Sequence, residues 1–447
     1  MKVLAPLVFF KTLLLILFLL YGGVHLGPDE AQYWTWSQKL APGYYSKPPG
    51  IAYQIALGTS LFGSTELGVR FGSLVIGIFL PFLIYYLARL SSLSPTQAMW
   101  AGIIWAFSPL GWLGSVLAIT DGGMILFWTL ACIVLLRQGS GWLLGFTVAL
   151  GALFKWPIYL FWLFAFFYLW KKWDQRFILA ALLSLLGLLP ALWWNIDNDW
   201  ATFRHVGATL QGGSGGIQAK GNPLEFLAAQ VALLSPIFFV GMLMAYKKQE
   251  KPLRLSYLIT LPSLALGTLL SLFMKIQGNW AIFAYPTAPL LIAHKSSKAW
   301  LLTGTLLSLA MVLGGYLFVP LKHNSGWEKL PFLLQQAGYN PETHFLVSDK
   351  YQNTSLLSFY SPEQKSAYFL NLRGDRLNQF SFWPSLKEEY LHKDGFFVTF
   401  EPSNPHLEPY FSTVETLSPM TLTPTKNAYL YKVTDYNGQE PTFSDKY

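Results

Sequence analysis

A succession of long apolar runs, separated by short polar segments, is the feature that most constrains how this chain can fold. Of its 447 residues, 53% are hydrophobic and only 12% are charged, whereas an ordinary soluble domain carries roughly 25% charged residues. A helix that crosses a bilayer needs about 20 predominantly apolar residues. The runs therefore predict a polytopic, α-helical membrane protein.

We expect about eleven membrane-spanning helices. Some candidate segments are short for a span and would have to tilt or break near the membrane surface. The candidates are residues 5–24, 68–90, 97–113, 119–136, 142–154, 157–170, 177–194, 224–246, 254–273, 280–294 and 299–319.

Basic residues are concentrated in alternate loops between these segments. Loops rich in Lys and Arg normally face the cytoplasm, so the net charge of +8 indicates orientation and not a nucleic-acid surface. The opposite face then holds a first outer loop of about residues 25–66, a second loop at 195–223, and everything after Pro320. We expect that face to be the periplasmic side of a bacterial inner membrane.

The chain changes character after Pro320. Residues 321–447 are polar, and their patterns predict an amphipathic helix at Gly326–Ala337 and strands at His344–Ser348, Gly395–Phe400 and Ala428–Val433. We therefore expect two domains: a transmembrane domain at 1–320 and a small extracytoplasmic α/β domain at 321–447. Residues 211–216 are rich in glycine and are either a mobile lid or a slack connector.

Polar residues that are unusual in so apolar a chain gather at the predicted outer surface, although they come from distant segments. Ionised groups at membrane depth are costly and usually line a site, so we expect a functional site that acts on a lipid-borne substrate. The candidate residues are Asp29, Glu30, Lys47, Asp121, Lys155, Arg204, His205 and Asn279.

Several of these residues have both a functional and a structural interpretation. Asp29 and Glu30 are a general base and its orienter, or solvated carboxylates where a helix leaves the membrane. Lys47 binds a phosphate as a point charge, or extends to the lipid headgroups. Asp121 orients Lys47 or caps the start of a helix, and these two interpretations are compatible.

Other polar groups define what the substrate can be. Arg204 and His205 either hold a phosphate or an acceptor, or make ordinary interfacial contacts. Asp197 and Asp199 resemble a metal-binding pair, but two carboxylates alone do not make a site for a hard cation, so we expect no cofactor and leave a metal open. The chain has no Walker or GxGxxG motif for a soluble nucleotide, so an activated sugar donor would have to be membrane-borne.

Short motifs follow one another in a fixed order along the chain. They are Asp29-Glu30-Ala31-Gln32-Tyr33-Trp34, Gly43-Tyr44-Tyr45-Ser46-Lys47-Pro48-Pro49, Thr120-Asp121-Gly122, Phe154-Lys155-Trp156, Phe203-Arg204-His205, Gln277-Gly278-Asn279-Trp280 and Ser348-Asp349-Lys350-Tyr351-Gln352. Taken together, the chain resembles the GT-C glycosyltransferases, specifically the family 39-like group of protein O-mannosyltransferases and lipid A aminoarabinose transferases.

The resemblance implies a many-helix membrane enzyme that takes a sugar from a polyprenyl-phosphate donor on the outer face. It implies that Asp29 is catalytic and that the lysine before the two prolines, Lys47, binds the donor phosphate. The position before that lysine is often acidic or histidine in relatives, but here it is Ser46, so a second carboxylate from this loop is not expected. The remaining candidates complete the site: Glu30 and Asp121 as catalytic carboxylates, Lys155 and Arg204 at the donor phosphate, and Tyr33, Tyr45, His205 and Asn279 at the substrates.

We therefore expect a glycosyltransferase that moves a sugar, with inversion, to an envelope acceptor. Lipid A or another lipid-linked glycan is favoured, and the sugar itself is left open. The expected partners are the donor, the acceptor and membrane lipids, with no nucleic acid. A protein O-glycosyltransferase of the same type is one alternative. A non-enzymatic transporter or flippase of lipid-linked sugars is another, although no inverted repeat is visible.

Overall fold

The chain forms two compact units in a computed structural model that describes residues 1–21, 24–170, 172–210, 221–246, 250–318, 326–401, 405–423 and 426–441. The unit that we call the helical unit comprises Met1–Leu20, Lys47–Trp193 and Leu210–Pro320. The other, the sheet unit, comprises Tyr21–Ser46, Trp194–Thr209 and Leu321–Tyr447. Two earlier segments thus join the C-terminal residues in one unit, while the domain boundary at residue 320 stays a prediction.

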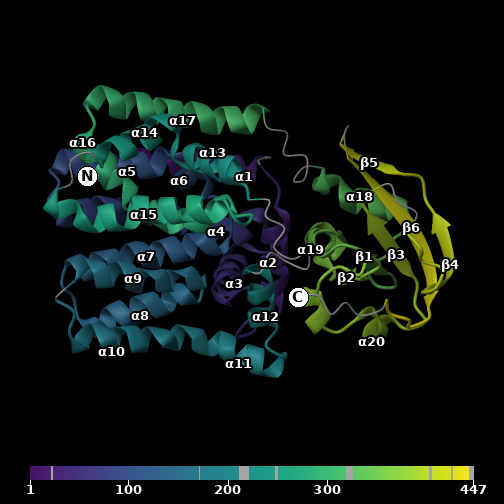
Figure 1. Cartoon of the computed structure of the whole chain (residues 1–447). Coiled ribbons are helices and arrows are strands. Elements are labelled where there is room, and N and C mark those ends of the chain that lie inside the picture. Colours follow the sequence, from purple (N-terminus) through teal and green to yellow (C-terminus); the bar gives the residue numbers. More distant parts are fainter. Residues whose placement is uncertain are drawn as a thin grey trace. The chain divides into compact units, whose positions relative to one another are not determined.

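The helical unit is a bundle of mostly apolar helices (Figure 1). Its elements are α1 (Leu4–Leu20), α3 (Gly50–Phe62), α4 (Glu66–Leu90), α5 (Pro95–Phe107), α6 (Pro109–Leu113), α7 (Thr120–Leu136), α8 (Gly141–Ala152), η1 (Trp156–Tyr159), α9 (Leu160–Tyr168), α10 (Gln175–Ser184), η2 (Leu185–Leu188), α11 (Leu189–Asp197), α13 (Pro223–Leu234), α14 (Pro236–Ala245), η3 (Lys251–Leu253), α15 (Arg254–Ser271), η4 (Gly278–Ala284), α16 (Ala288–Lys295) and α17 (Lys298–Phe318).

Four stretches of described helix are long and apolar enough to cross a membrane. They are Glu66–Leu90, Gln175–Asp197, Lys251–Ser271 and Lys298–Gly315. A fifth would join Pro223–Leu234 to Pro236–Ala245, with a bend of 97° between the two helices. Each predicted span contains helix, and the expected helical membrane architecture is confirmed, but the number of eleven spans stays a prediction.

Some apolar runs that read as one span are broken at Ser-Pro pairs. Proline disfavours helical dihedrals in the residue before it. Ser108 accordingly ends α5, and its hydroxyl accepts the Gly111 N–H at 3.1 Å where α6 begins. Ser235, before Pro236, has a φ of 77° and separates α13 from α14. These breaks shorten the regular helices without removing the segments from the bundle.

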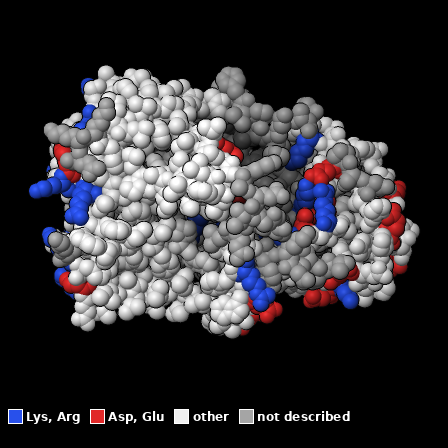
Figure 2. All heavy atoms as spheres, viewed as in Figure 1, with Lys and Arg blue, Asp and Glu red and all other residues white. Residues whose placement is uncertain are grey.

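Charged side chains collect at one end of the helical unit, whereas the visible middle of the bundle is almost free of them (Figure 2). The loops joining α4 to α5, α7 to α8, α9 to α10, α14 to α15 and α16 to α17 alternate along the chain with the other loops. Described basic residues in or beside them are Arg89, Arg137, Lys172, Lys251 and Lys295. This distribution agrees with a bundle whose middle faces lipid.

The sheet unit combines short helices with a mixed sheet (Figure 1). Its helices are α2 (Pro28–Gln38), α12 (Ala201–Leu210), η5 (Trp327–Lys329), α18 (Leu330–Gln336), α19 (Tyr351–Tyr360), η6 (Pro362–Gln364), η7 (Gln379–Phe382) and α20 (Leu386–Tyr390). Its strands are β1 (Phe345–Ser348), β2 (Tyr368–Phe369), β3 (Gly395–Thr399), β4 (Phe411–Thr416), β5 (Met420–Thr423) and β6 (Lys426–Tyr436).

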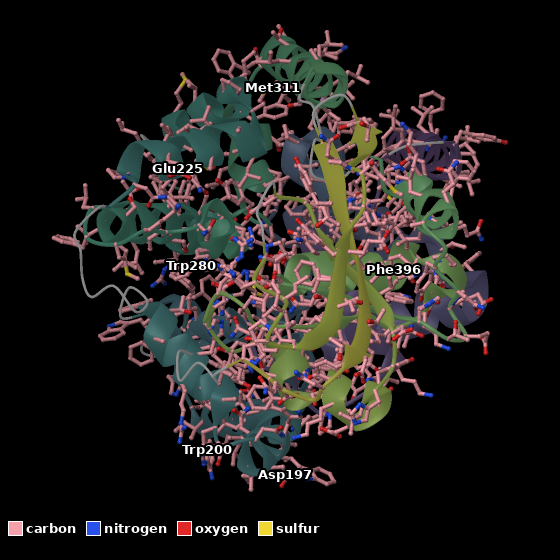
Figure 3. The ribbon with its side chains drawn as sticks, turned by 90° about the vertical axis from the view of Figure 1, so that its right-hand side faces the viewer. Asp197, Trp200, Glu225, Trp280, Met311 and Phe396 are labelled. Carbon is pink, nitrogen blue, oxygen red and sulfur yellow. The ribbon has the colours of Figure 1, made fainter. Side chains whose placement is uncertain are left out.

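Within the described residues, the strand order is β2-β1-β3-β6-β4, with β5 also paired to β6. β1 runs parallel to β2 and β3, and β6 runs antiparallel to its neighbours. Phe396, on β3, is fully buried (Figure 3). Because β1, β2 and β3 run parallel, their carboxyl ends lie at one edge of the sheet. Open α/β sheets usually bind ligands at this edge.

The predicted elements of this unit are present, and further elements accompany them. The three predicted strands correspond to β1, β3 and β6, and the amphipathic helix corresponds to η5 and α18. The segments predicted as outer loops are in part helical, because 25–66 contains α2 and α3 and 195–223 contains α12. Residues 211–216, the candidate lid, lie outside the described residues.

Candidate active site

Three segments of the helical unit meet at Asp121. This residue lies in the first turn of α7 and is only 4% exposed. Its Oδ1 accepts a hydrogen bond from Lys155 Nζ at 2.7 Å, and its Oδ2 accepts one from Asn279 Nδ2 at 3.0 Å. A buried carboxylate is tolerated when it is paired and hydrogen-bonded. Asp121 therefore fixes the positions of two other predicted site residues.

The structural alternative for Asp121, a helix cap, is wrong. The N-cap position of α7 is occupied by Ile119, and no side chain caps this helix. Asp121 comes two residues later, where a carboxylate also benefits from the partial positive charge of the helix N-terminus. Both of its oxygens accept hydrogen bonds from side chains of other segments, Lys155 and Asn279, and its catalytic role stays a prediction.

Two glycines bring the sequence motifs of the helical unit into contact. The Gly50 N–H, three residues after Lys47, donates to the Leu153 carbonyl at 2.7 Å, and a Cβ at Gly50 would lie 2.6 Å from that oxygen. A Cβ on Gly123 would lie 2.2 Å from Phe154 Cδ1. Both approaches require glycine. They place the start of α3 and the start of α7 against the turn that follows α8.

Asp29 and Glu30 have different surroundings at the start of α2. Glu30 is 2% exposed, and its Oε2 accepts the Gly27 N–H at 3.0 Å as part of a capping box. Asp29 is exposed. The contact gives Glu30 a structural role at this helix start, and its predicted catalytic role stays a prediction. Of the two carboxylates, Asp29 is the one that a substrate can reach.

A second group of predicted residues lies in the sheet unit. The rings of Tyr45 and His205 are 4.8 Å apart. Arg376 Nη1 lies 2.9 Å from His205 Nδ1, so this imidazole nitrogen accepts the hydrogen bond. The Tyr45 N–H donates to Gln379 Oε1 at 2.7 Å. The contacts join residues from 21–46, from α12 and from the loop after β2.

Tyr351, the first residue of α19, connects this group with Asp29. Burial raises the pKa of Tyr351, and the carboxylate of Asp29 raises that pKa further. Arg376 acts in the opposite direction through its charge and a side-chain hydrogen bond to Tyr351. The phenol therefore stays protonated at neutral pH, and Asp29, Tyr351 and Arg376 are close enough to influence one another.

The remaining predicted residues have less specific surroundings. Lys47 is half-buried at the start of its segment, and Arg204 is exposed on α12. Tyr33 is buried in α2, with its ring 4.9 Å from that of Trp36. Their assigned roles at donor and substrates stay predictions.

The Asp197–Asp199 pair follows α11, and Asp197 lies close to Trp200 in this turn (Figure 3). Asp199 and Trp200 both have positive φ, at 51° and 58°. No group of three or more His, Cys, Asp or Glu side chains is placed to hold a metal ion within the described residues. The described residues thus offer this pair no further ligand.

Sequence reasoning did not single out Arg376 or Tyr351 as site residues. Tyr351 belongs to a C-terminal motif, and Arg376 lies in a polar stretch where a charged residue is unremarkable. The only signal is positional, because Tyr351 follows the buried strand β1, Arg376 follows the half-buried strand β2, and the carboxyl ends of these parallel strands share one edge of the sheet.

Comparisons with known proteins agree with this architecture. Residues 46–194 match the family model described as dolichyl-phosphate-mannose-protein mannosyltransferase. The lipid A galacturonosyltransferase RgtD of Rhizobium johnstonii is 30% identical over 310 residues. That match covers 65% of this chain and 64% of the relative, so the chain spans a little less than two thirds of the relative's length.

Solved structures share the fold over nearly the whole chain. ArnT from Cupriavidus metallidurans in the apo state has a TM-score of 0.70 at 14% identity, covering 97% of this chain and 98% of that one. The same protein bound to undecaprenyl phosphate has a TM-score of 0.60 at 13% identity, covering 92% and 94%. The fold is therefore that of a helical membrane protein of the ArnT type. The family match over residues 46–194 and the curated relative agree with the resemblance to the GT-C glycosyltransferases that the sequence predicted.

Proposed function

We propose that this chain transfers a sugar from a polyprenyl-phosphate donor to an acceptor of the cell envelope, with lipid A or another lipid-linked glycan favoured. The structural observation that carries the proposal is the meeting of Asp121, Lys155 and Asn279, which the sequence assigned to one site. The relative's name as a lipid A galacturonosyltransferase and the undecaprenyl phosphate bound to ArnT support it. A uronic acid is accordingly the first sugar to test.

The donor phosphate binds to the cations of the site. Lys47 is the principal phosphate ligand, and Lys155 and Arg204 add positive charge. Asp121 restricts Lys155 to one position through the 2.7 Å ion pair. As the bond between sugar and phosphate breaks, negative charge grows on the leaving phosphate, and fixed cations stabilise that charge without having to reorganise.

The transfer is a single displacement. The bond from the anomeric carbon to the phosphate oxygen breaks, and its electron pair leaves with the phosphate. An acceptor oxygen attacks the opposite face of the sugar, which has oxocarbenium character, so the configuration inverts. If the acceptor is a hydroxyl, Asp29 takes its proton; if the acceptor is already an anion, Asp29 positions it.

The reaction takes place on the outer, periplasmic face of the inner membrane. The basic residues at one end of the helical unit support this orientation, because such loops normally stay in the cytoplasm. In this topology the 1–320 domain spans the membrane about eleven times, and the 321–447 domain lies outside it.

A reconstituted assay tests the proposal. The purified full-length chain is placed in vesicles with labelled polyprenyl-phosphate galacturonic acid and lipid A, and Lys47→Ala serves as the inactive control. Covalently labelled lipid A in the wild type alone supports the transferase. Movement of the labelled donor between leaflets without a new glycoconjugate would identify a transporter instead.

Mass spectrometry of a deletion strain identifies the acceptor. Lipid A, surface polysaccharide and envelope proteins are compared with those of the parent strain. Loss of one sugar from lipid A supports the favoured acceptor, and loss from a protein would assign the chain to the protein O-glycosyltransferases.

A further inference from the structure

Arg373 and Arg376 of the sheet unit differ in whether they form ion pairs with carboxylates in the described part of the chain. Arg373 donates from Nε and Nη2 to Asp349 Oδ2 at 2.9 and 2.6 Å, and its Nη1 lies 2.7 Å from Glu401 Oε2. Arg376 forms no ion pair with any Asp or Glu in the described part of the chain. Arginine does not lose its proton in proteins, so Arg376 is a permanent cation whose protein partners there are a histidine and a tyrosine.

The loop that carries Arg376 is held in place on both sides. Asn371 Nδ2 donates to the Asp375 carbonyl at 2.8 Å, and Asn371 Oδ1 accepts the Asp375 N–H at 2.9 Å. After Arg376, the side chain of Gln379 is buried and accepts the Tyr45 N–H. A guanidinium on such a loop is ordered before any ligand arrives, which lowers the entropic cost of binding.

The neighbours of Arg376 are hydrogen-bonding groups, and both Tyr351 and Arg376 follow the carboxyl ends of parallel strands, where open α/β sheets usually bind ligands. Tyr351 begins α19 directly after the parallel strand β1, and Arg376 follows the parallel strand β2. Asp29 raises the pKa of Tyr351, so its carboxylate lies within electrostatic reach of the phenol. One anionic group and one cation thus act on the same hydroxyl.

We propose that Arg376, together with the Tyr351 hydroxyl and His205, binds a phosphate group of the acceptor beside Asp29. The inference rests on the proposed function, because it identifies the charge of the acceptor. An anionic acceptor brought to Asp29 is repelled by that carboxylate, and a guanidinium that can bind two oxygens at once offsets the repulsion. Arg373 does not serve this purpose, since Asp349 and Glu401 already occupy it.

Arginine modification tests the binding directly, without any sugar transfer. Full-length protein in lipid nanodiscs is treated with phenylglyoxal, and the modification of each arginine is followed by mass spectrometry. The added probes are lipid A with its phosphates, enzymatically dephosphorylated lipid A, and undecaprenyl phosphate. Arg176, whose side chain is 78% exposed, is the internal control.

We expect phosphorylated lipid A to slow the modification of Arg376 and not that of Arg176, and dephosphorylated lipid A to have no effect. Equal protection by both forms of lipid A would overturn the proposal. Protection by undecaprenyl phosphate, and not by lipid A, would overturn it as well, because the arginine would then belong to the donor.

Kinetics provide the second measurement. Arg376→Ala should raise the acceptor KM by about 10- to 100-fold, the usual effect of one lost charge-assisted hydrogen bond, and leave the donor KM unchanged. Arg376→Lys, which keeps the charge, should restore part of the loss. Lys387→Ala removes an exposed charge of the same unit and is the matched control.

An equal change in both KM values would contradict an acceptor site and indicate a general structural role. If lipid A protects Arg376 but the wild type makes no glycoconjugate, the proposed reaction fails while the anion site stands. The two failures are therefore distinguishable.

Discussion

Two charged side chains, Asp121 in the helical unit and Arg376 in the sheet unit, differ in whether an opposite charge pairs with them in the described part of the chain. In the helical unit, Asp121 accepts from Lys155 and Asn279, so one carboxylate holds both donors. In the sheet unit, Arg376 contacts only uncharged partners, His205 and Tyr351, among the described residues. A carboxylate whose two oxygens are both hydrogen-bonded holds its neighbours in place, whereas a cation that is not paired with a carboxylate can attract an anionic ligand. Burial and complete pairing therefore indicate a side chain that positions others, and incomplete pairing indicates a side chain that can bind a ligand.

Replacing Asp29 by Asn should have the largest effect and shows how the exposed carboxylate acts. If Asp29 removes a proton from an acceptor hydroxyl, kcat should fall by about 10²- to 10⁴-fold, the usual contribution of a positioned base. If the acceptor is an anion, no proton has to be removed, and the loss should be much smaller. Steady-state transfer by the purified variant measures this, with size-exclusion chromatography as the control for folding. Full activity would reject any role for Asp29.

A double-mutant cycle tests whether Asp121 and Lys155 act together in donor binding. Asp121→Asn leaves the Lys155 cation without its counter-charge, and Lys155→Met removes the cation itself. Each change should weaken donor binding by about 10- to 100-fold, the effect expected for a hydrogen bond between charged groups. The double variant should be no worse than either single variant, because both remove the same contact. Donor KM values for the four proteins test this, and additive losses would show that the two side chains act separately.

The sequence predicted buried apolar elements better than exposed polar ones. Apolar runs predicted the helices, and β1 and β3 were found because every residue in them is buried. β4 was missed, since most of its residues face solvent and carry polar side chains. The topology placed Asp121, Lys155 and Asn279 in one layer, but no sequence pattern reveals which side chains bond.

Arg376 could not be predicted on the same grounds. A charged residue is conspicuous in an apolar segment because its burial is costly, but it is ordinary in a polar C-terminal segment. What distinguishes Arg376 from Arg373 is the ion pairs that it lacks in the described part of the chain, and such a difference appears only in three dimensions. Likewise, Asp29 and Glu30 are adjacent in sequence, but only the structure separates the exposed carboxylate from the buried one.

Removing the charge of Asp349 should change stability more than activity. Asp349 is 3% exposed and accepts two hydrogen bonds from Arg373. Asp349→Asn should destabilise the sheet unit by about 1–3 kcal/mol, the cost of leaving a buried partner incompletely bonded. Hydrogen exchange of the β1 and β3 amides measures the loss, and Asp375→Asn, an equal change at an exposed residue, is the control. If exchange is unchanged, the ion pair contributes little to this unit.

The smallest expected effect is that of Glu30→Gln, which separates the two adjacent carboxylates of α2. Glutamine also serves at this position of a capping box, so the contact with the Gly27 N–H is kept. Loss of helix stability should stay below about 1 kcal/mol, and transfer should match the wild type, in contrast to Asp29→Asn. Glu30→Ala, which removes the cap, should lower the thermal unfolding temperature without changing the acceptor KM. A loss of transfer in a stable Glu30→Gln protein as large as that of Asp29→Asn would show that Glu30 takes part in the reaction, because its cap would still be in place.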